Sequence, residues 1–295
     1  MFEDCSVMII AAGAHANEIY RLDVDADTQK DICSAFETAL GDLITDKTRI
    51  KFDGSYKPHR DEFLAVENFQ LADKIKDAIR DPLGVTVYEK KDGNFLEIKA
   101  VFLGKRTEAD DTEKFKVAFQ RFRKEQYIST SWFNLFFTDD TFHREKNFGI
   151  SISDNIDCFY TEGELQFSSF FFARQVFDLG DYYRSATDQE VECFAGSDKL
   201  SLENVDNFKG MANTWNRRKI AMINDSKVLE NYSANEIKDL AYESGIIVNI
   251  KDEKVVIPND KEQVKIILGF LDEEAYKGPF SRNTYLANSK RKVSN

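Results

Sequence analysis

Hydrophobic and polar side chains alternate in several short runs of the first 125 residues, and this period of two predicts β-strands. An Asp92-Gly93 pair lies between two of these runs and is typical of a hairpin turn. Residues 108–111 form an acidic loop before the last run. We therefore expect an antiparallel sheet whose strands are residues 19–24, 49–52, 85–88, 95–103 and 115–119.

Apolar residues at helical spacing predict two helices in the same region. One spans residues 27–45 with Asp27 as its N-cap, and the other spans residues 69–80, where Asp81 and Pro82 end it. Together with the strands, they predict a small α+β module at residues 1–125. Residues 126–146 are aromatic without clean periodicity, and we expect a connecting segment with one short helix there.

From residue 147 the pattern predicts a few strands followed mainly by helices. Ser233 and Glu236 have the spacing of a capping box, which marks a helix start. The fold class is therefore α+β, with an N-terminal antiparallel sheet module and, at residues 147–295, a C-terminal module of strand hairpins and helices. Strands are expected at residues 148–152, 156–160, 165–168, 246–250 and 255–257, and helices at 170–177, 181–194, 202–208, 211–224, 233–245 and 260–271.

Composition narrows the class of protein. The 295 residues are 42% hydrophobic and include 25 Phe, which is typical of a folded chain with a Phe-rich core. The net charge of −12 repels nucleic acid, so any such binding needs a local basic patch. Four scattered cysteines and the lack of an apolar run of membrane-spanning length favour a reduced, cytoplasmic protein.

Catalytic and cofactor motifs are absent from the sequence. It contains no phosphate loop, dinucleotide glycine pattern or nucleophile elbow, and its three histidines form no close pair with a cysteine or another histidine. We therefore assign no catalytic residue, metal ligand or cofactor. One enzymatic alternative is a Mg²⁺-dependent nuclease, in which Glu97 would hold the metal and Lys99 would polarise the attack, with Asp81 and Asp92 upstream.

Basic residues form several clusters, and two interpretations of them are open. They can bind DNA phosphates, or they can lie on the chain's own acidic surface. Residues 277–295 contain five Lys or Arg and no acid, so we expect this tail to contribute most to DNA affinity. Residues 217–219 are consecutive on a predicted helix, so at least one must point inward. The candidate DNA-binding residues are Arg121, Arg123, Lys124, Arg144, Lys146, Arg217, Arg218, Lys219, Arg282, Lys290, Arg291 and Lys292.

Within residues 147–292, six segments stand out as a series: residues 156–159, 170–177, 181–183, 217–220, 264–274 and 285–290. This series resembles the KwaB-like family of the Kiwa anti-phage system. Most of these positions are packing residues, so they identify a family better than an activity.

The resemblance implies a soluble, dimeric DNA-binding protein in a two-gene bacterial defence system. Its partner would be a KwaA-like multi-span membrane protein that recruits it to the inner membrane, where it hinders phage DNA replication and transcription. No recognition-helix pattern is present, so we expect contacts to the phosphate backbone and no sequence specificity. A scaffold that binds the membrane subunit without binding DNA is the third alternative.

Overall fold

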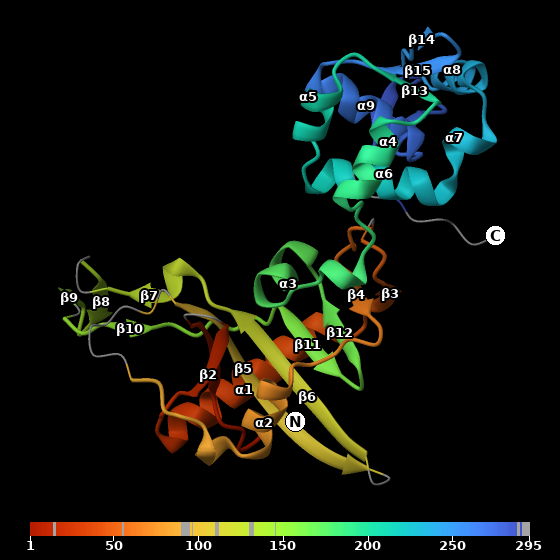
Figure 1. Ribbon diagram of the computed structural model, residues 1–295. Helices are drawn as coiled ribbons and strands as arrows, with labels where there is room; N and C mark the ends of the chain where they lie inside the picture. Colours follow the sequence, from red (N-terminus) through yellow and green to blue (C-terminus); the bar gives the residue numbers. More distant parts are fainter. Residues whose placement is uncertain are drawn as a thin grey trace. The chain divides into compact units, whose positions relative to one another are not determined.

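The computed structural model describes residues 1–13, 16–54, 56–89, 95, 97–109, 112–129, 133–144, 146–287 and 290. The chain forms two compact units (Figure 1). Unit 1 comprises Met1–Phe52 and Pro58–Leu179, and unit 2 comprises Asp53–Lys57 and Gly180–Asn295. Helices and strands occur in both units, which confirms the α+β class.

Unit 1 is built on a large, mainly antiparallel sheet, in which only β3 (Thr48–Lys51) and β4 (Glu62–Val66) are parallel neighbours among the described strands. Because β11 (Cys158–Thr161) pairs with β6 (Thr112–Arg121) and β12 (Glu164–Phe167) pairs with β4, residues 147–179 belong to unit 1. The division therefore falls later in the chain than the boundaries at 125 and 147 expected from the sequence. In sheet order the strands are β2 (Asn17–Arg21), β1 (Met8–Ala12), β5 (Ile98–Ala109), β6 (Thr112–Arg121), β11 (Cys158–Thr161), β12 (Glu164–Phe167), β4 (Glu62–Val66) and β3 (Thr48–Lys51).

Aromatic side chains fill one face of this sheet. The Phe102 and Phe119 ring centroids lie 5.5 Å apart, and Phe177 packs edge-on against Phe119 at 4.8 Å. Helices α2 (Asp73–Arg80) and α3 (Phe170–Val176) pack on β5 and β6. A Cβ on Gly104 would lie 2.3 Å from Ile79 Cδ1, so α2 approaches β5 too closely for a larger residue. The strand register aligns the buried residues Phe102, Phe119, Cys158, Phe167 and Leu64.

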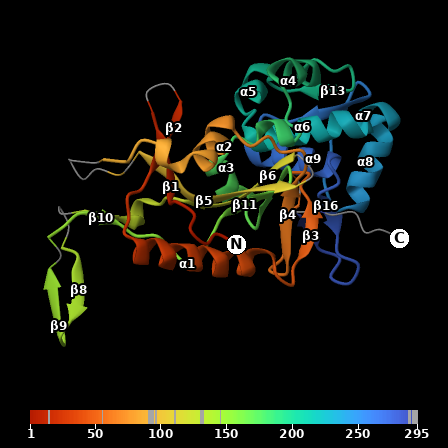
Figure 2. The same cartoon turned by 90° about the horizontal axis from the view of Figure 1, so that it is seen from below.

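The other face is covered by the long helix α1 (Ala26–Ile44), as Figure 2 shows. Its apolar side packs on the sheet, where Phe36 and Leu40 join a buried cluster with Val101 and Phe159. The side chain of Asp25, and not that of Asp27 as predicted, caps the helix by accepting a hydrogen bond from the Thr28 backbone. The predicted helix is otherwise confirmed.

Two predicted connections are wrong. Val87 bridges Arg21 of β2, and β5 pairs with β1 on one side and β6 on the other, so the described parts of residues 85–88 and 95–103 do not pair as a hairpin. The predicted turn at Asp92-Gly93 lies outside the described residues. Residues 126–146 contain strands and no α-helix within their described part. The elements around this segment are the 3₁₀ turn η2 (Lys124–Gln126), β7 (Tyr127–Ile128), β8 (Leu135–Thr138), β9 (Thr141–Arg144) and β10 (Gly149–Ile150).

Unit 2 combines helices with two small sheets, and its predicted capping box at Ser233 and Glu236 is confirmed. Residues 202–208, predicted as one helix, divide into the end of β13 (Leu200–Leu202) and the first part of α5 (Val205–Gly210). Among the described residues, no helix has the length and apolar content needed to cross a bilayer. The helices are α4 (Asp188–Ala195), α5 (Val205–Gly210), α6 (Thr214–Ser226), α7 (Val228–Asn231), α8 (Ala234–Glu243) and α9 (Lys261–Leu271). The strands are β13, β14 (Ile250–Lys251), β15 (Lys254–Ile257), β16 (Ala275–Lys277) and β17 (Thr284–Leu286). Besides η2, the described residues form the 3₁₀ turns η1 (Pro82–Gly84) in unit 1 and η3 (Gly180–Tyr182) in unit 2.

Candidate nucleic-acid interface

Arg121 ends β6 and is held in place by α3. Its guanidinium lies 3.9 Å from the centroid of the Phe172 ring, and its Nη1 donates a hydrogen bond of 2.7 Å to Gln175 Oε1. Phe172 and Gln175 are three residues apart on α3, so they lie on one face of the helix. A cation stacked on an aromatic ring has a fixed direction at little entropic cost. The end of strand β6 and the helix α3 therefore position Arg121 in advance of any ligand.

Asp157 lies behind this arginine, away from solvent. Its carboxylate accepts a 2.7 Å hydrogen bond from the Arg121 backbone N–H, and its Oδ1 lies 3.8 Å from Arg121 Nε. Burial raises the pKa of Asp157, against the opposing influence of this hydrogen bond and of Arg121 and Arg123. Asp157 is only 5% exposed and lies on the inner side of the Arg121 guanidinium. It therefore does not occupy the solvent-facing side of the guanidinium, where a phosphate would bind.

A buried pair of glutamines fixes the turn that follows β6. Gln120, which is fully buried, donates from Nε2 to the Ser153 carbonyl at 2.7 Å and accepts the Ser153 N–H at 3.0 Å. Gln126 donates to Gln120 Oε1 at 3.2 Å and accepts the Arg123 N–H at 2.9 Å. Buried amides with satisfied donors and acceptors make a rigid network. The backbone that carries Arg123 and Lys124 is therefore held in one conformation by hydrogen bonds to Gln120 and Gln126 within unit 1.

Three further cations lie on these same elements. Arg123 donates from Nη2 to Asn155 Oδ1 at 3.3 Å, Lys124 is exposed, and Arg174 projects from α3 with its guanidinium 6.0 Å from the Phe170 ring. Within the described part of the chain, none of the three forms an ion pair. The Nε atoms of Arg121 and Arg123 are buried and have no hydrogen-bond partner among the described residues. We call Arg121, Arg123, Lys124 and Arg174 the β6–α3 patch.

Lys219 and Lys290, by contrast, are tied to acidic residues of unit 2. Lys219 is 4% exposed, its Nζ lies 2.6 Å from Asp272 Oδ2, and it also pairs with Glu274. Lys290 Nζ lies 2.8 Å from the other oxygen of Asp272. We call these four residues the unit 2 charge network. Lys219 is thus part of the core, which confirms that one of residues 217–219 points inward. The ammonium group of Lys290 is already engaged in an ion pair with Asp272.

The other predicted cations are dispersed. Arg217 donates to the Ala212 and Ala186 carbonyls and pairs with Asp188 at 2.5 Å, whereas Arg218 lies 5.8 Å from the Tyr183 ring. Arg144 lies on β9 with its guanidinium 4.3 Å from the Phe133 ring, and the exposed Lys146 follows it. Arg282 is exposed, and Arg291 and Lys292 lie outside the described residues. Arg174, which the sequence analysis did not select, lies on α3, the same helix whose Phe172 and Gln175 contact Arg121.

A comparison of the sequence with models of known protein families identifies the family to which this chain belongs. The model of the family described as Kiwa protein KwaB-like matches residues 112–280, more than half of the chain. The chain belongs to the KwaB-like family. It is therefore a Kiwa defence-related protein, as the resemblance implied. No match is found among curated proteins or among solved structures.

The family match includes β6 and α3, and hence the complete β6–α3 patch of this KwaB-like chain. It begins at residue 112, well before the segments that carried the resemblance. Arg174 belongs to one of those segments, residues 170–177, but no local pattern groups it with residues 121–124. The missing signal was the packing of α3 against the end of β6, which only the fold provides.

The residues of the nuclease alternative have other partners in this KwaB-like chain. Glu97 accepts a 2.8 Å hydrogen bond from the Tyr88 hydroxyl, and Lys99 Nζ donates to Asn17 Oδ1 at 2.6 Å. Asp81 caps its own turn by accepting the Gly84 N–H at 3.1 Å. Asp92 lies outside the described residues, and within them no group of three or more His, Cys, Asp or Glu could hold a metal ion.

Proposed function

We propose that this KwaB-like protein is the sequence-nonspecific DNA-binding subunit of a membrane-associated anti-phage complex, where it hinders phage DNA replication and transcription. The observation that supports DNA binding is the β6–α3 patch, because its cations are positioned by the fold and three of them form no ion pair with a described residue. The other basic clusters of the prediction contribute less, since Arg217, Lys219 and Lys290 are held by acids.

The arrangement of the patch favours phosphates over base edges. Its cations come from the end of a strand, a turn and a short helix, and phosphates repeat along any duplex. Reading bases requires several side chains on one element that enters a groove. Stacking of Arg121 on Phe172 also suits guanidinium contacts to phosphate, which are planar and can be bidentate.

The net charge of −12 limits how such a patch works. Long-range repulsion between the acidic chain and DNA weakens encounter, and salt screens both this repulsion and the local attraction. Two copies that act together would double the number of phosphate contacts. We therefore propose that the protein binds DNA as a homodimer, on the cytoplasmic side, and reaches the inner membrane through a KwaA-like multi-span partner. A Kiwa family member implies other subunits, which supports this division of labour.

We further propose that the protein acts by binding and not by catalysis. Glu97 and Lys99 have local hydrogen-bond partners that give each of them a structural role. We expect Glu97→Gln and Lys99→Met to keep both duplex binding and phage protection near the wild-type level.

The experiment incubates the purified protein with linear duplex DNA and Mg²⁺ and then separates the products by electrophoresis. A shift without shortened DNA is the expected result for the wild type and for both variants. Shortened DNA that disappears with Glu97→Gln would establish the nuclease instead. A folded protein that neither shifts nor cuts DNA would leave the scaffold alternative.

A further inference from the structure

The strands β16 and β17 form a hairpin whose loop exposes a phenylalanine. Their register ends with the pair Lys277 and Thr284, so residues 278–283 make the connecting loop. Phe280 in this loop is 97% exposed, more than any other large apolar side chain of the described residues. Figure 2 shows β16 on the opposite side of unit 2 from α4 and α5. A single exposed ring is common, so its surroundings decide whether it has a role.

The loop holds this ring in a defined place. The Gly278 N–H donates to the Asn283 carbonyl at 2.9 Å, and the Arg282 N–H donates to the Gly278 carbonyl at 3.0 Å. A Cβ on Gly278 would lie 2.8 Å from Cε2 of Tyr285, so the loop closes tightly against this tyrosine. A compact loop of this kind is packed by its own side chains. Phe280 is therefore presented to solvent by a fixed turn.

One face of the hairpin attaches it to unit 2. Ala275 is buried, and on the same face Thr284 Oγ1 donates to the Ser244 carbonyl at 2.9 Å. Tyr276 and Tyr285 are paired on the other face, where their rings stack with centroids 5.6 Å apart, and both residues are exposed. The hairpin therefore stands on the body of unit 2 and presents two tyrosines and the loop to solvent.

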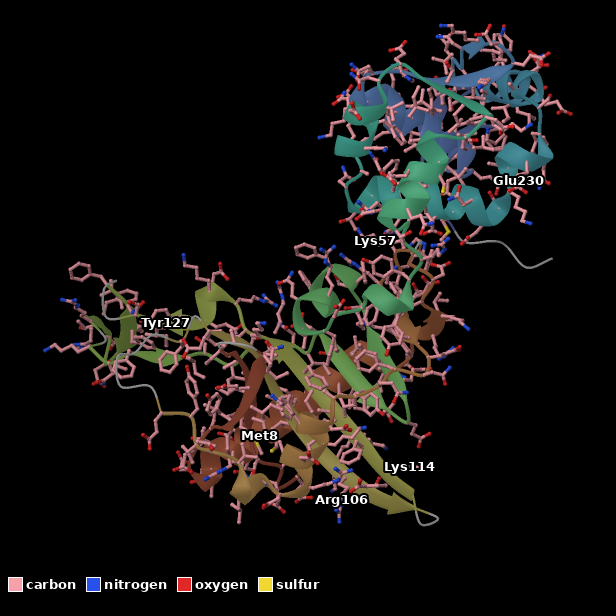
Figure 3. The ribbon with its side chains drawn as sticks, in the orientation of Figure 1. Met8, Lys57, Arg106, Lys114, Tyr127 and Glu230 are labelled. Atoms are coloured by element: carbon pink, nitrogen blue, oxygen red, sulfur yellow. The ribbon has the colours of Figure 1, made fainter. Side chains whose placement is uncertain are left out.

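The charges around the exposed ring are all positive. Lys277 and Arg282 flank Phe280, and residues 275–287 contain no acid. Within the described residues, neither cation forms an ion pair. The rest of unit 2 carries exposed acids, such as Glu230 at its periphery in Figure 3, and the whole chain has a net charge of −12. We call Lys277, Phe280 and Arg282 the hairpin tip, which is complementary in charge to an anionic surface.

The form of the hairpin tip favours a lipid surface over a nucleic-acid strand. Proteins that bind single strands combine a basic groove with successive rings on which bases stack. Here one ring is almost fully exposed, and the two tyrosines stack on each other. A bilayer accepts such a tip without a matching pocket, because the ring enters the headgroup boundary while the cations stay among the phosphates. Tyrosine is also enriched at membrane interfaces.

We propose that the hairpin tip inserts into an anionic lipid surface. Phe280 enters the boundary between headgroups and acyl chains, and Lys277 and Arg282 donate to lipid phosphates. This goes beyond the proposed function, in which only a partner brings the chain to the membrane. One ring and two cations give a weak, reversible contact, in which each cation strengthens binding roughly fivefold. The contact therefore adds to recruitment by a partner and does not replace it.

The first test measures how much of the purified full chain sediments with lipid vesicles. We expect binding to vesicles that contain phosphatidylglycerol and little binding to vesicles of phosphatidylcholine alone. Lys277→Glu/Arg282→Glu should weaken binding by at least about tenfold, because two attractive contacts become repulsive. The matched control Lys261→Glu/Lys265→Glu makes the same change in net charge on α9 and should weaken binding far less. All four side chains are exposed, so circular dichroism should not change.

A tryptophan at the hairpin tip tests insertion itself. Phe280→Trp should keep the affinity, and its fluorescence should shift to shorter wavelength and be quenched by lipids with brominated acyl chains, after subtraction of the signal from the two native tryptophans. Val205→Trp is the control, since Val205 is also exposed in unit 2 but lies on α5, on the opposite side from β16 (Figure 2). Phe280→Ser removes the apolar group and should weaken binding by at least about fivefold.

Three outcomes would overturn the proposal. They are a wild type that does not bind anionic vesicles, binding that survives Lys277→Glu/Arg282→Glu, and a Phe280→Trp fluorescence that anionic vesicles leave unchanged. A Phe280→Trp signal that responds to single-stranded or duplex DNA and not to vesicles would assign the hairpin tip to nucleic acid instead. The vesicle measurements include no DNA, so failure there is distinct from failure of DNA binding by the β6–α3 patch.

Discussion

Replacing Lys219 with methionine is expected to destabilise unit 2 by about 3–5 kcal/mol, the cost of removing one partner from a buried ion pair. Within the unit 2 charge network, Lys219 contacts both buried acids, Asp272 and Glu274, whereas Lys290 contacts Asp272. Both acids are about 5–6% exposed. Without the ammonium group, Glu274 loses the ion pair that the structure gives it, and Asp272 keeps the one with Lys290. The variant leaves buried negative charge uncompensated.

Urea unfolding of the full chain measures this loss. The control is Lys227→Met, which removes an exposed lysine next to the same helix and should change the unfolding free energy by less than about 0.5 kcal/mol. The double variant Lys219→Met/Glu274→Met removes one base and one acid, so it should recover much of the stability. If the single variant cost less than about 1 kcal/mol, or the double variant were no better, the network would not be a structural ion cluster.

Charge reversal in the β6–α3 patch is the second large effect. Arg123→Glu/Lys124→Glu is expected to weaken duplex binding by at least about tenfold, equivalent to about 1.4 kcal/mol, because two attractive phosphate contacts become repulsive. Both side chains are at least partly exposed and neither forms an ion pair with a described residue. The melting temperature should therefore change little. Fluorescence anisotropy with a labelled duplex gives the affinity.

The matched control changes the net charge equally at another place. Lys261→Glu/Lys265→Glu reverses two exposed lysines on α9 in unit 2 and should reduce affinity far less. Equal losses for both double variants would mean that overall charge, and not the patch, controls binding. An unchanged affinity for Arg123→Glu/Lys124→Glu would place the DNA contacts elsewhere, and Arg144, Lys146, Arg218 and Arg282 are the remaining described candidates outside the patch.

The sequence predicted the helices of this protein better than its connections. A helix cap depends on residues only a few positions apart, so the capping box of Ser233 and Glu236 could be predicted from the sequence alone. The β8–β9 hairpin was missed because Leu135, Phe136 and Phe137 are all apolar, which hides the period of two. A strand with a buried face alternates, but both faces of this hairpin are exposed in the isolated chain.

The sequence predicted that the candidate site would consist of clustered Lys and Arg residues. It did not show which of the basic clusters would be left without acidic partners. In the sequence, Arg121, Arg123 and Lys124 are one basic cluster among several, and the C-terminal tail was expected to contribute more. What distinguishes the clusters is their acidic partners, and these come from far along the chain: Asp272 is 53 residues from Lys219. Such pairs depend on how α6 packs against the end of α9, which no local pattern encodes. The expectation that the C-terminal bases matter most overlooked the same kind of contact at Lys290.

The salt dependence of duplex affinity tests the central claim most directly, because backbone contacts release counterions in proportion to their number. Four contacts from the patch predict that the logarithm of the affinity falls with the logarithm of the salt concentration at a slope of about −3 to −4 per protein chain. The slope for Arg123→Glu/Lys124→Glu should be shallower by about two. A wild-type affinity that does not change with salt, or a slope that the double variant leaves unaltered, would contradict phosphate binding by the β6–α3 patch.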